Sequence, residues 1–415
     1  MAPRLVVTGL AVLAAAGCGG GRGTGTEATG QKLGDEAQKA LDELDDASAR
    51  EPDVAGDIER LLGERAHALE QADVHALSAT ASGRQRARDR VAAQRAKKLG
   101  IERVRLVAHD LQTSGGRAEA KVTLSYRVRG MNRPFYAERR LIARKESVGW
   151  RVTSDSARRE ALPWEVASFA TTRAPHVVLL AAPGVDAAPL RTGLAAAYRE
   201  IERELPARDL PRSVVVIGAR DDAQAERLTG RIAHGVVALA NVAVEFGPAP
   251  AFEVERVLAQ RMLVIDSRWS TLPEAERQST LVHEMTHTAL NPDTSGRTPP
   301  WLAEGVAMYV SGDDRSEEAR LRAAGAAQSI ELRKLCRPSS IFRLTGQEQG
   351  AAYAAASGAA EAIVAQHGTK GLFELYDAFN DPEIEGRTCV ATTDRILRRT
   401  LGMSLAELEA AVAGG

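Results

Sequence analysis

The sequence predicts an α+β protein with two folded parts, and three observations lead to this prediction. Apolar residues recur at helical spacing from about residue 35 to residue 100. From 101 to 154 the pattern changes to the alternation of strands, separated by turn-forming residues. After residue 176 a few buried strands precede a long helical region. We therefore expect N-terminal helices with an antiparallel sheet, then a domain with a small sheet and a mostly helical C-terminal half.

Composition limits the function classes. The chain has 415 residues, of which 44% are hydrophobic and 26% charged. This length suits two to three domains, and the composition excludes a disordered chain and a polytopic membrane protein. The 54 basic residues nearly balance the 55 acidic ones, so we expect no nucleic-acid partner recruited by overall charge.

The N-terminus has the order of a secretory signal: basic residues, the apolar run Leu5–Ala16, and small residues before Cys18. The run is too short to span a bilayer as a helix, which takes about 20 residues. The sequence resembles a bacterial lipoprotein signal of residues 1–17. That resemblance implies lipidation of Cys18 and anchoring on the outer face of the cell membrane. Ala15 stands where the usual pattern prefers Leu, so an ordinary signal with an incidental cysteine is the alternative. The Gly-rich residues 18–34 are expected to form a flexible tether.

Only two cysteines remain after Cys18, namely Cys336 and Cys389. In an exported chain such a pair predicts one disulfide, closing a loop of roughly 50 residues. Two separate buried thiols are the alternative.

Residues 35–162 are expected to form one module, followed by a linker at 163–175. Helices come first, and four candidate strands follow: Val104–Val107, Ala118–Val128, Phe135–Ala143 and Trp150–Val152. In order and length this module is similar to the NTF2-like fold, a resemblance that implies a binding or scaffolding role.

Residues 84–105 are strongly basic. Such a cluster could contact phosphate or anionic lipid headgroups. A solvated helix face is the simpler interpretation and the favoured one. No aromatic side chain lies among the charges, so bases would have nothing to stack on.

Residues 283–287 read HEMTH, the HExxH pattern, in a helical context. Positions i and i+4 of a helix lie about 40° apart around the axis, so His283 and His287 can bind one zinc ion. Glu284 projects beside the metal, where it can act as a general base. A third ligand is available in Glu304, on a short helix that Pro299 and Pro300 begin.

HExxH followed by "WLAEGVAMY" resembles the gluzincin metallopeptidases, and more narrowly the peptidase MA-like group, over residues 176–415. The resemblance implies that His283, His287 and Glu304 hold Zn²⁺ and that Glu284 is the general base. The metzincin pattern is excluded because residues 290 and 293 are Leu and Asp. Asp293 as the third ligand is a less favoured alternative.

Three further positions follow from this resemblance. Met308 stands where many gluzincins have an acidic residue that orients a histidine. Tyr353 is the candidate hydrogen-bond donor to the developing oxyanion, with a core-packing tyrosine as the alternative. The strand Arg261–Ile265 is expected to be an edge that pairs with an extended peptide.

The sequence thus predicts a zinc-dependent endopeptidase, lipid-anchored outside the cell, that hydrolyses a peptide or protein substrate. One alternative is a non-catalytic envelope-binding lipoprotein with a structural or vestigial zinc site. Another is a scaffold in which HExxH is a chance match, without metal.

Overall fold

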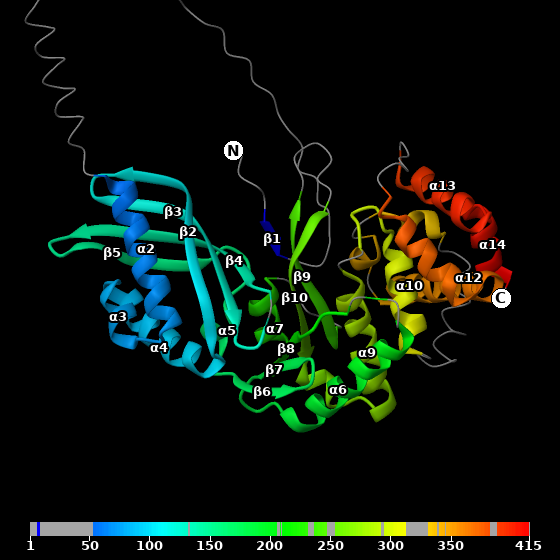
Figure 1. Ribbon diagram of the computed structural model, residues 1–415, viewed down its shortest axis with the longest axis horizontal. Helices are drawn as coiled ribbons and strands as arrows, with labels where there is room; N and C mark the ends of the chain where they lie inside the picture. The colour runs from blue at the N-terminus through cyan, green and yellow to red at the C-terminus, as the bar shows by residue number, and fades with distance from the viewer. Residues whose placement is uncertain are drawn as a thin grey trace, which may run out of the picture.

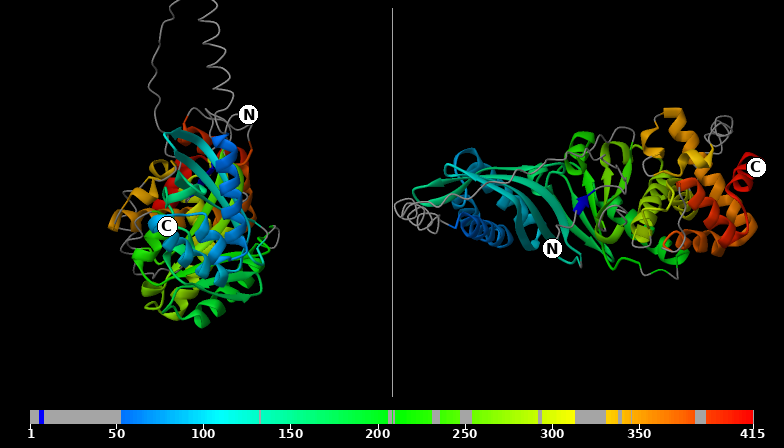
Figure 2. Two further views of the ribbon diagram at one scale, coloured as in Figure 1. Left: turned by 90° about the vertical axis from the view of Figure 1, so that its left-hand side faces the viewer. Right: turned by 90° about the horizontal axis from the view of Figure 1, so that it is seen from above.

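The computed structural model describes most of the chain. The described residues are 6–8, 53–131, 133–205, 208, 210–230, 236–246, 254–291, 294–312, 331–337, 340–344, 346–381 and 388–414. The molecule is elongated, with a helix-and-sheet module at one end, a mixed sheet in the middle and helices at the other end (Figures 1 and 2). The predicted α+β class is confirmed. Cys18, the predicted tether and Asp293 lie outside the described residues.

The first module begins with three helices, α2 (Val54–Glu70), α3 (Val74–Ala79) and α4 (Gly83–Leu99). Asp53 caps α2 by accepting from the Gly56 N–H at 2.8 Å, and this bond satisfies a donor that the helix itself leaves unpaired. Helix α4 ends at Gly100, whose φ of 65° is the left-handed conformation that glycine adopts at little cost.

Four antiparallel strands follow in chain order: β2 (Ile101–Ser114), β3 (Arg117–Val128), β4 (Phe135–Glu146) and β5 (Gly149–Ala157). Alternate residues of β3, from Ala118 to Val128, are buried on the side of the helices. Strand β2 is longer than the predicted Val104–Val107, because its second half is largely exposed and polar and hence lacks an apolar pattern.

The interior of this module contains an ionic network. Arg65 donates to Asp89 at 2.7 Å and 3.2 Å, and Arg139 donates to Asp155 at 2.8 Å and to Glu165 at 2.5 Å. Arg65, Asp89 and Arg139 are 3% exposed or less. Each buried charge of this network has an opposite charge beside it, since an unpaired charge in the interior is costly.

The mixed sheet has the strand order β1-β9-β10-β8-β7-β6. Its strands are β6 (Ala170–Ala174), β7 (Val177–Ala181), β8 (Val214–Ala219), β9 (Ala238–Phe246), β10 (Val254–Ile265) and the three-residue β1 (Val6–Thr8). Strands β7, β8 and β10 are parallel neighbours, and the other pairs are antiparallel.

Because β10 pairs with β8 on one side and β9 on the other, the expectation that Arg261–Ile265 forms an edge is wrong. Strand β9 lies farther out, and β1 pairs with it from Ala243 to Glu245.

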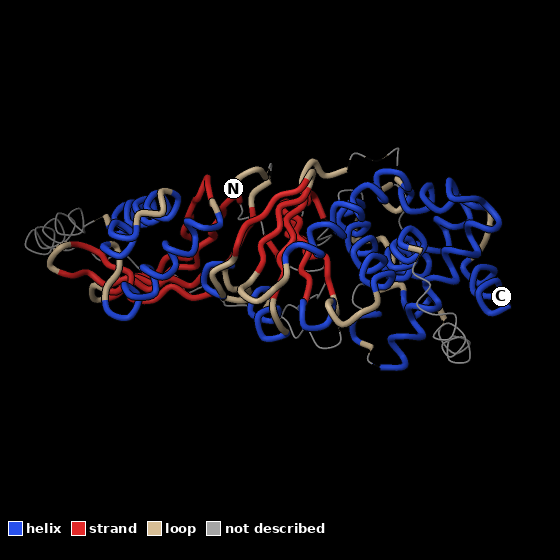
Figure 3. Tube along the Cα trace, turned by 90° about the horizontal axis from the view of Figure 1, so that it is seen from below, coloured by secondary structure: helices blue, strands red, loops and turns tan. Residues whose placement is uncertain are grey.

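Both faces of the mixed sheet are covered. Helices α6 (Ala187–Glu204) and α9 (Glu274–Leu290) cover one face, against Met262 and Val264 of β10. The first module covers the other face together with α5 (Pro163–Val166) and α7 (Asp222–Thr229), against Leu263 and Ile265. Figure 3 shows the strands between these layers.

The segment expected to be a linker, 163–175, instead contains α5 and β6, with Trp164 and Phe169 buried in the core shared by both parts. A buried ion pair between Glu160 and Arg261 of β10 adds a polar contact across the same junction.

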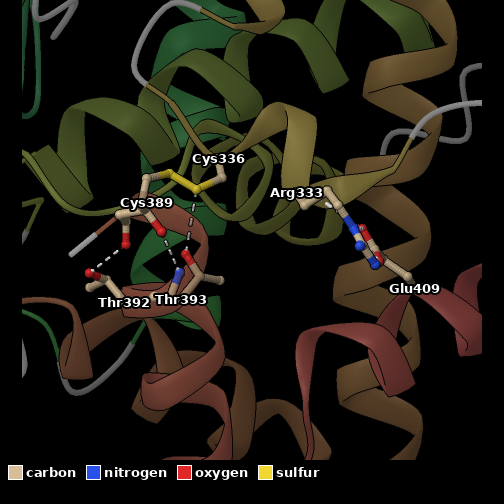
Figure 4. Close-up of a disulfide and its surroundings, with 8 residues drawn as sticks. Arg333, Cys336, Cys389, Thr392, Thr393 and Glu409 are labelled. Atoms are coloured by element: carbon tan, nitrogen blue, oxygen red, sulfur yellow. Dashed lines mark hydrogen bonds and ion pairs between the residues drawn. A yellow bond between two sulfur atoms is a disulfide. The ribbon is translucent and has the colours of Figure 1, made fainter. Parts of the chain in front are cut away.

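The C-terminal half is helical. Its elements are α8 (Asp266–Trp269), α9, α10 (Pro300–Ser311), the 3₁₀ turns η2 (Leu332–Leu335) and η3 (Ile341–Arg343), α12 (Gly346–Ala378, kinked at Gly368), α13 (Cys389–Leu401) and α14 (Leu405–Gly414). A disulfide joins Cys336, after η2, to Cys389 at the start of α13, with Cα atoms 6.0 Å apart (Figure 4). Arg333 of η2 also pairs with Glu409 of α14. Among the described residues, no helix combines the length and apolarity that a bilayer span requires.

Candidate metal centre

Helix α9 carries three of the predicted site residues. Glu274 and Glu276 lie in its first turn, where negative charge is favourable beside the helix N-terminus. Leu281, Val282 and Met285 are fully buried and fix one face of the helix on the core. This packing determines how the helix is turned, and it sets the positions of His283 and His287, one turn apart.

Helix α10 supplies Glu304. Pro300 suits the first turn because its missing N–H would have no helical partner there. Trp301, Leu302 and Val306 are 0% exposed and hold α10 in the same core as α9. Glu304 thereby faces the two histidines although it follows His287 only after a long turn.

Gly305 lets α12 pass directly against α10. A Cβ atom at this position would lie 2.3 Å from the backbone oxygen of Ala356 and 3.3 Å from the Cβ of Ala360. No side chain fits into this contact. A glycine immediately after Glu304 therefore allows close packing behind the site.

The three candidate ligands converge. His283 Nε2 and His287 Nε2 each lie 3.3 Å from Glu304 Oε2, and the two Nε2 atoms are 3.2 Å apart. A tetrahedral zinc ion about 2.0–2.1 Å from each ligand atom places those atoms roughly 3.3–3.4 Å apart. The donor set and its spacing therefore fit zinc, and these residues form the one such cluster of acidic, His and Cys side chains within the described part of the chain.

The site is buried and negatively charged when its histidines are neutral. Side-chain exposure is 5% for His283, 6% for Glu304 and 18% for His287. Burial alone would raise the pKa of Glu304, but the two histidines outweigh it and hold this pKa well below its usual range. Burial alone would lower the pKa of His287, yet the Glu304 carboxylate raises it to about 9. The site thus favours a positive charge between these groups.

Glu284 lies against the outer part of the mixed sheet. Its Oε2 accepts a hydrogen bond from the backbone N–H of Ala240, in β9, at 2.6 Å. Sequence reasoning did not identify Ala240, since the contact joins residues 44 positions apart and no local pattern marks it. The bond orients the carboxylate of the predicted general base.

One nitrogen of the site has no protein partner. The Nδ1 atom of His283 is buried and has no hydrogen bond to any residue that the structure describes. Met308, one turn after Glu304, is 6% exposed and offers no polar group that could orient this ring. Metal-binding histidines usually have such a partner on the second nitrogen.

Tyr353 lies on α12, half-buried against the core of the C-terminal half. It precedes Ala356, the residue that contacts Gly305, by about one helical turn. This places it on the element behind Glu304, and its role as oxyanion donor stays a prediction.

No protein-family model and no curated protein matches this chain.

Proposed function

We propose that this protein is a zinc-dependent peptidase of gluzincin type. One observation carries the proposal: two imidazoles and a carboxylate, 3.2–3.3 Å apart and buried, lie next to a carboxylate that is not part of the triad. The combination of a His₂Glu ligand set with a neighbouring glutamate is typical of catalytic rather than structural zinc sites.

When bound, zinc would lower the pKa of a water molecule to about 7 and polarise a peptide carbonyl. His283, His287 and Glu304 would hold the ion. Glu284 accepts a proton from the water as its oxygen attacks the carbonyl carbon. The C–N bond then breaks, and Glu284 returns the proton to the leaving amine nitrogen. The Ala240 N–H keeps the Glu284 carboxylate oriented through both transfers.

The proposed location is the outer face of the cell membrane, with the lipid on Cys18. The order of charge, apolar run and small residues at the N-terminus supports it. The Cys336–Cys389 disulfide is consistent with an oxidising compartment. The expected substrate is a peptide or protein on that side of the membrane.

A second candidate is a zinc lipoprotein without turnover, which binds an envelope partner. The unpaired Nδ1 of His283 favours it, because a loosely oriented ligand is compatible with a structural or vestigial site. This candidate predicts one bound zinc ion per chain, no turnover, and no phenotype for the variant Glu284→Gln.

The first experiment measures zinc per chain by elemental mass spectrometry in the purified protein, His283→Ala and Glu304→Ala. We expect about one zinc in the parent, in line with a single His₂Glu site, and marked loss in both variants. Glu274→Gln, an exposed carboxylate on the same helix, is the matched control and should keep its zinc. A folded parent that takes up no zinc would refute the proposal.

The second experiment separates the two candidates. A peptide library is incubated with the zinc-loaded parent and with Glu284→Gln. Cleavage by the parent alone supports the peptidase. Zinc binding without cleavage by either protein supports the non-catalytic alternative.

A further inference from the structure

Helix α4 presents a strongly basic surface that the metal centre does not use. Between residues 74 and 101 the only acidic residue is Asp89, which is 3% exposed and paired with Arg65 inside the module. The same stretch contains five arginines and two lysines. The surface of α4 therefore has positive charge that no acid of this stretch neutralises.

The cations are arranged in two rows along the helix. With about 100° per residue, Arg84 and Arg88 lie on one flank of the exposed side, and Arg86, Arg90 and Lys97 lie on the other. All five are exposed. Arg84, Arg88, Arg90 and Lys97 form no ion pair with any residue in the described ranges. We call these two rows and the strip between them the basic face.

The strip between the rows contains no acidic residue, and it contains one exposed cation, Lys98, which donates to Ser168 at 3.1 Å. Ala87, Val91 and Gln94 fall there, and Val91 is 43% exposed, one of few large apolar side chains that the described structure leaves so open. Cationic side chains around a small exposed apolar surface are found on helices that lie in a membrane interface. There the apolar residues enter the headgroup region and the long cationic side chains reach phosphates.

We propose that the basic face docks on an anionic phospholipid bilayer. Charge complementarity selects this occupant, since exposed arginines on such a face attract acidic headgroups. A nucleic acid is less suited, because α4 has no aromatic residue for base stacking.

The position of α4 is compatible with catalysis at the membrane. Helix α4 belongs to the module that packs on one face of the mixed sheet, and α9 packs on the opposite face (Figure 1). The basic face and the metal centre thus belong to opposite sides of the mixed sheet.

The test measures sedimentation of the full chain with phosphatidylcholine vesicles and with vesicles that also contain phosphatidylglycerol. The N-terminus is the same in every variant, so differences between variants report the folded surface. Each cation near an anionic surface strengthens binding about fivefold, so the variant Arg84→Glu/Arg88→Glu/Arg90→Glu should lose the preference for phosphatidylglycerol by roughly a hundredfold. For the parent, this preference should fall steeply above about 0.15 M salt.

The matched control is Arg191→Glu/Arg199→Glu/Arg212→Glu. These arginines are exposed, lie on or near α6, and give the same change in net charge. We expect this control to bind like the parent, and all three proteins to keep their thermal midpoint and zinc content. Equal loss in both variants, absence of a preference for phosphatidylglycerol, or equally tight competition by duplex DNA would each overturn the proposal. None of these results bears on the metal centre.

Discussion

Substitution of Gly305 by alanine tests whether the contact between α10 and α12 supports the metal site. The added Cβ would lie 2.3 Å from the backbone oxygen of Ala356, whereas real Cβ atoms essentially never approach a heavy atom within 3.0 Å. The two helices must therefore separate by about 0.7 Å or more. Since the obstacle is backbone, no side-chain rotation relieves it.

The energetic cost follows from this geometry. Overpacking of a core costs about 1–3 kcal/mol, and a backbone obstacle belongs at the upper end. Alanine regains up to about 1 kcal/mol of helix propensity. We therefore expect a net loss near 2 kcal/mol, which lowers the thermal midpoint by roughly 4–8 °C for a domain of this size. Because Glu304 precedes Gly305 and shifts with α10, zinc affinity should fall by about tenfold or more.

The assay combines chemical unfolding with competitive zinc titration, and Gly350→Ala is the control. Gly350 lies on α12 with nothing within 4 Å of its added Cβ, so this variant should gain roughly 0.5–1 kcal/mol and keep its zinc affinity. If Gly305→Ala were as stable as the parent and bound zinc equally well, the packing argument would be refuted.

Three further predictions concern single side chains. In the metal-free protein the raised pKa of His287 stabilises the fold by at most about 3 kcal/mol below pH 6.5, and this stability is lost as the pH rises through about 9. Urea unfolding in the presence of a chelator at several pH values measures this loss. The variant His287→Ala should show a flatter dependence of the unfolding free energy on pH. Arg65→Ala should cost about 3–5 kcal/mol in urea unfolding because it leaves Asp89 buried without its cation, whereas Arg60→Ala, exposed on the same helix, should stay within about 0.5 kcal/mol. Ala240→Pro removes the N–H that orients Glu284 and should lower kcat about 10–100-fold at unchanged zinc content, whereas Ala240→Gly retains the N–H and should keep its kcat.

The parts of the fold that local pattern determines could be predicted from the sequence. The helices before residue 100 and the strands β3, β4 and β5 bury one face each, so their apolar residues repeat at a recognisable period. The spacing of His283 and His287 is likewise local, because one helical turn brings both rings to the same side. Glu304 was identified through the motif around it, and the structure brings it to both histidines.

The parts that depend on sheet order could not be predicted. Strand β10 reads like any apolar strand, and only its two neighbours in space show that it is central. Ala240 has no signal of its own, since its contact with Glu284 depends on where β9 lies beside α9. The supposed linker was misassigned because two prolines and polar residues at 163–175 suggested a loop, while Trp164 and Phe169 are in fact core residues.

The core that the first module shares with the mixed sheet also determines whether residues 176–415 can fold without that module. Residues 176–415 contain the whole candidate metal centre, so the sequence alone suggests that they fold by themselves. Yet one face of their sheet is buried only by the first module and the segments joined to it. The apolar residues on that face are Val178, Leu180, Val215, Ile217, Leu263 and Ile265, each 4% exposed or less.

A chain of residues 176–415 should therefore fail to form a stable monomer. Exposing six such side chains at about 1.5–3 kcal/mol each costs roughly 9–18 kcal/mol, which is comparable to or larger than the whole net stability of a typical domain. A chain that begins at Asp53 keeps the cover and should be monomeric, with the cooperative unfolding of the parent. Light scattering and thermal unfolding distinguish the two. If the 176–415 chain were monomeric and had the same thermal midpoint as the longer chain, the first module would contribute no stability to the sheet. If only the 176–415 chain aggregated, both parts would share one core, and the first module would be needed to build the metal centre.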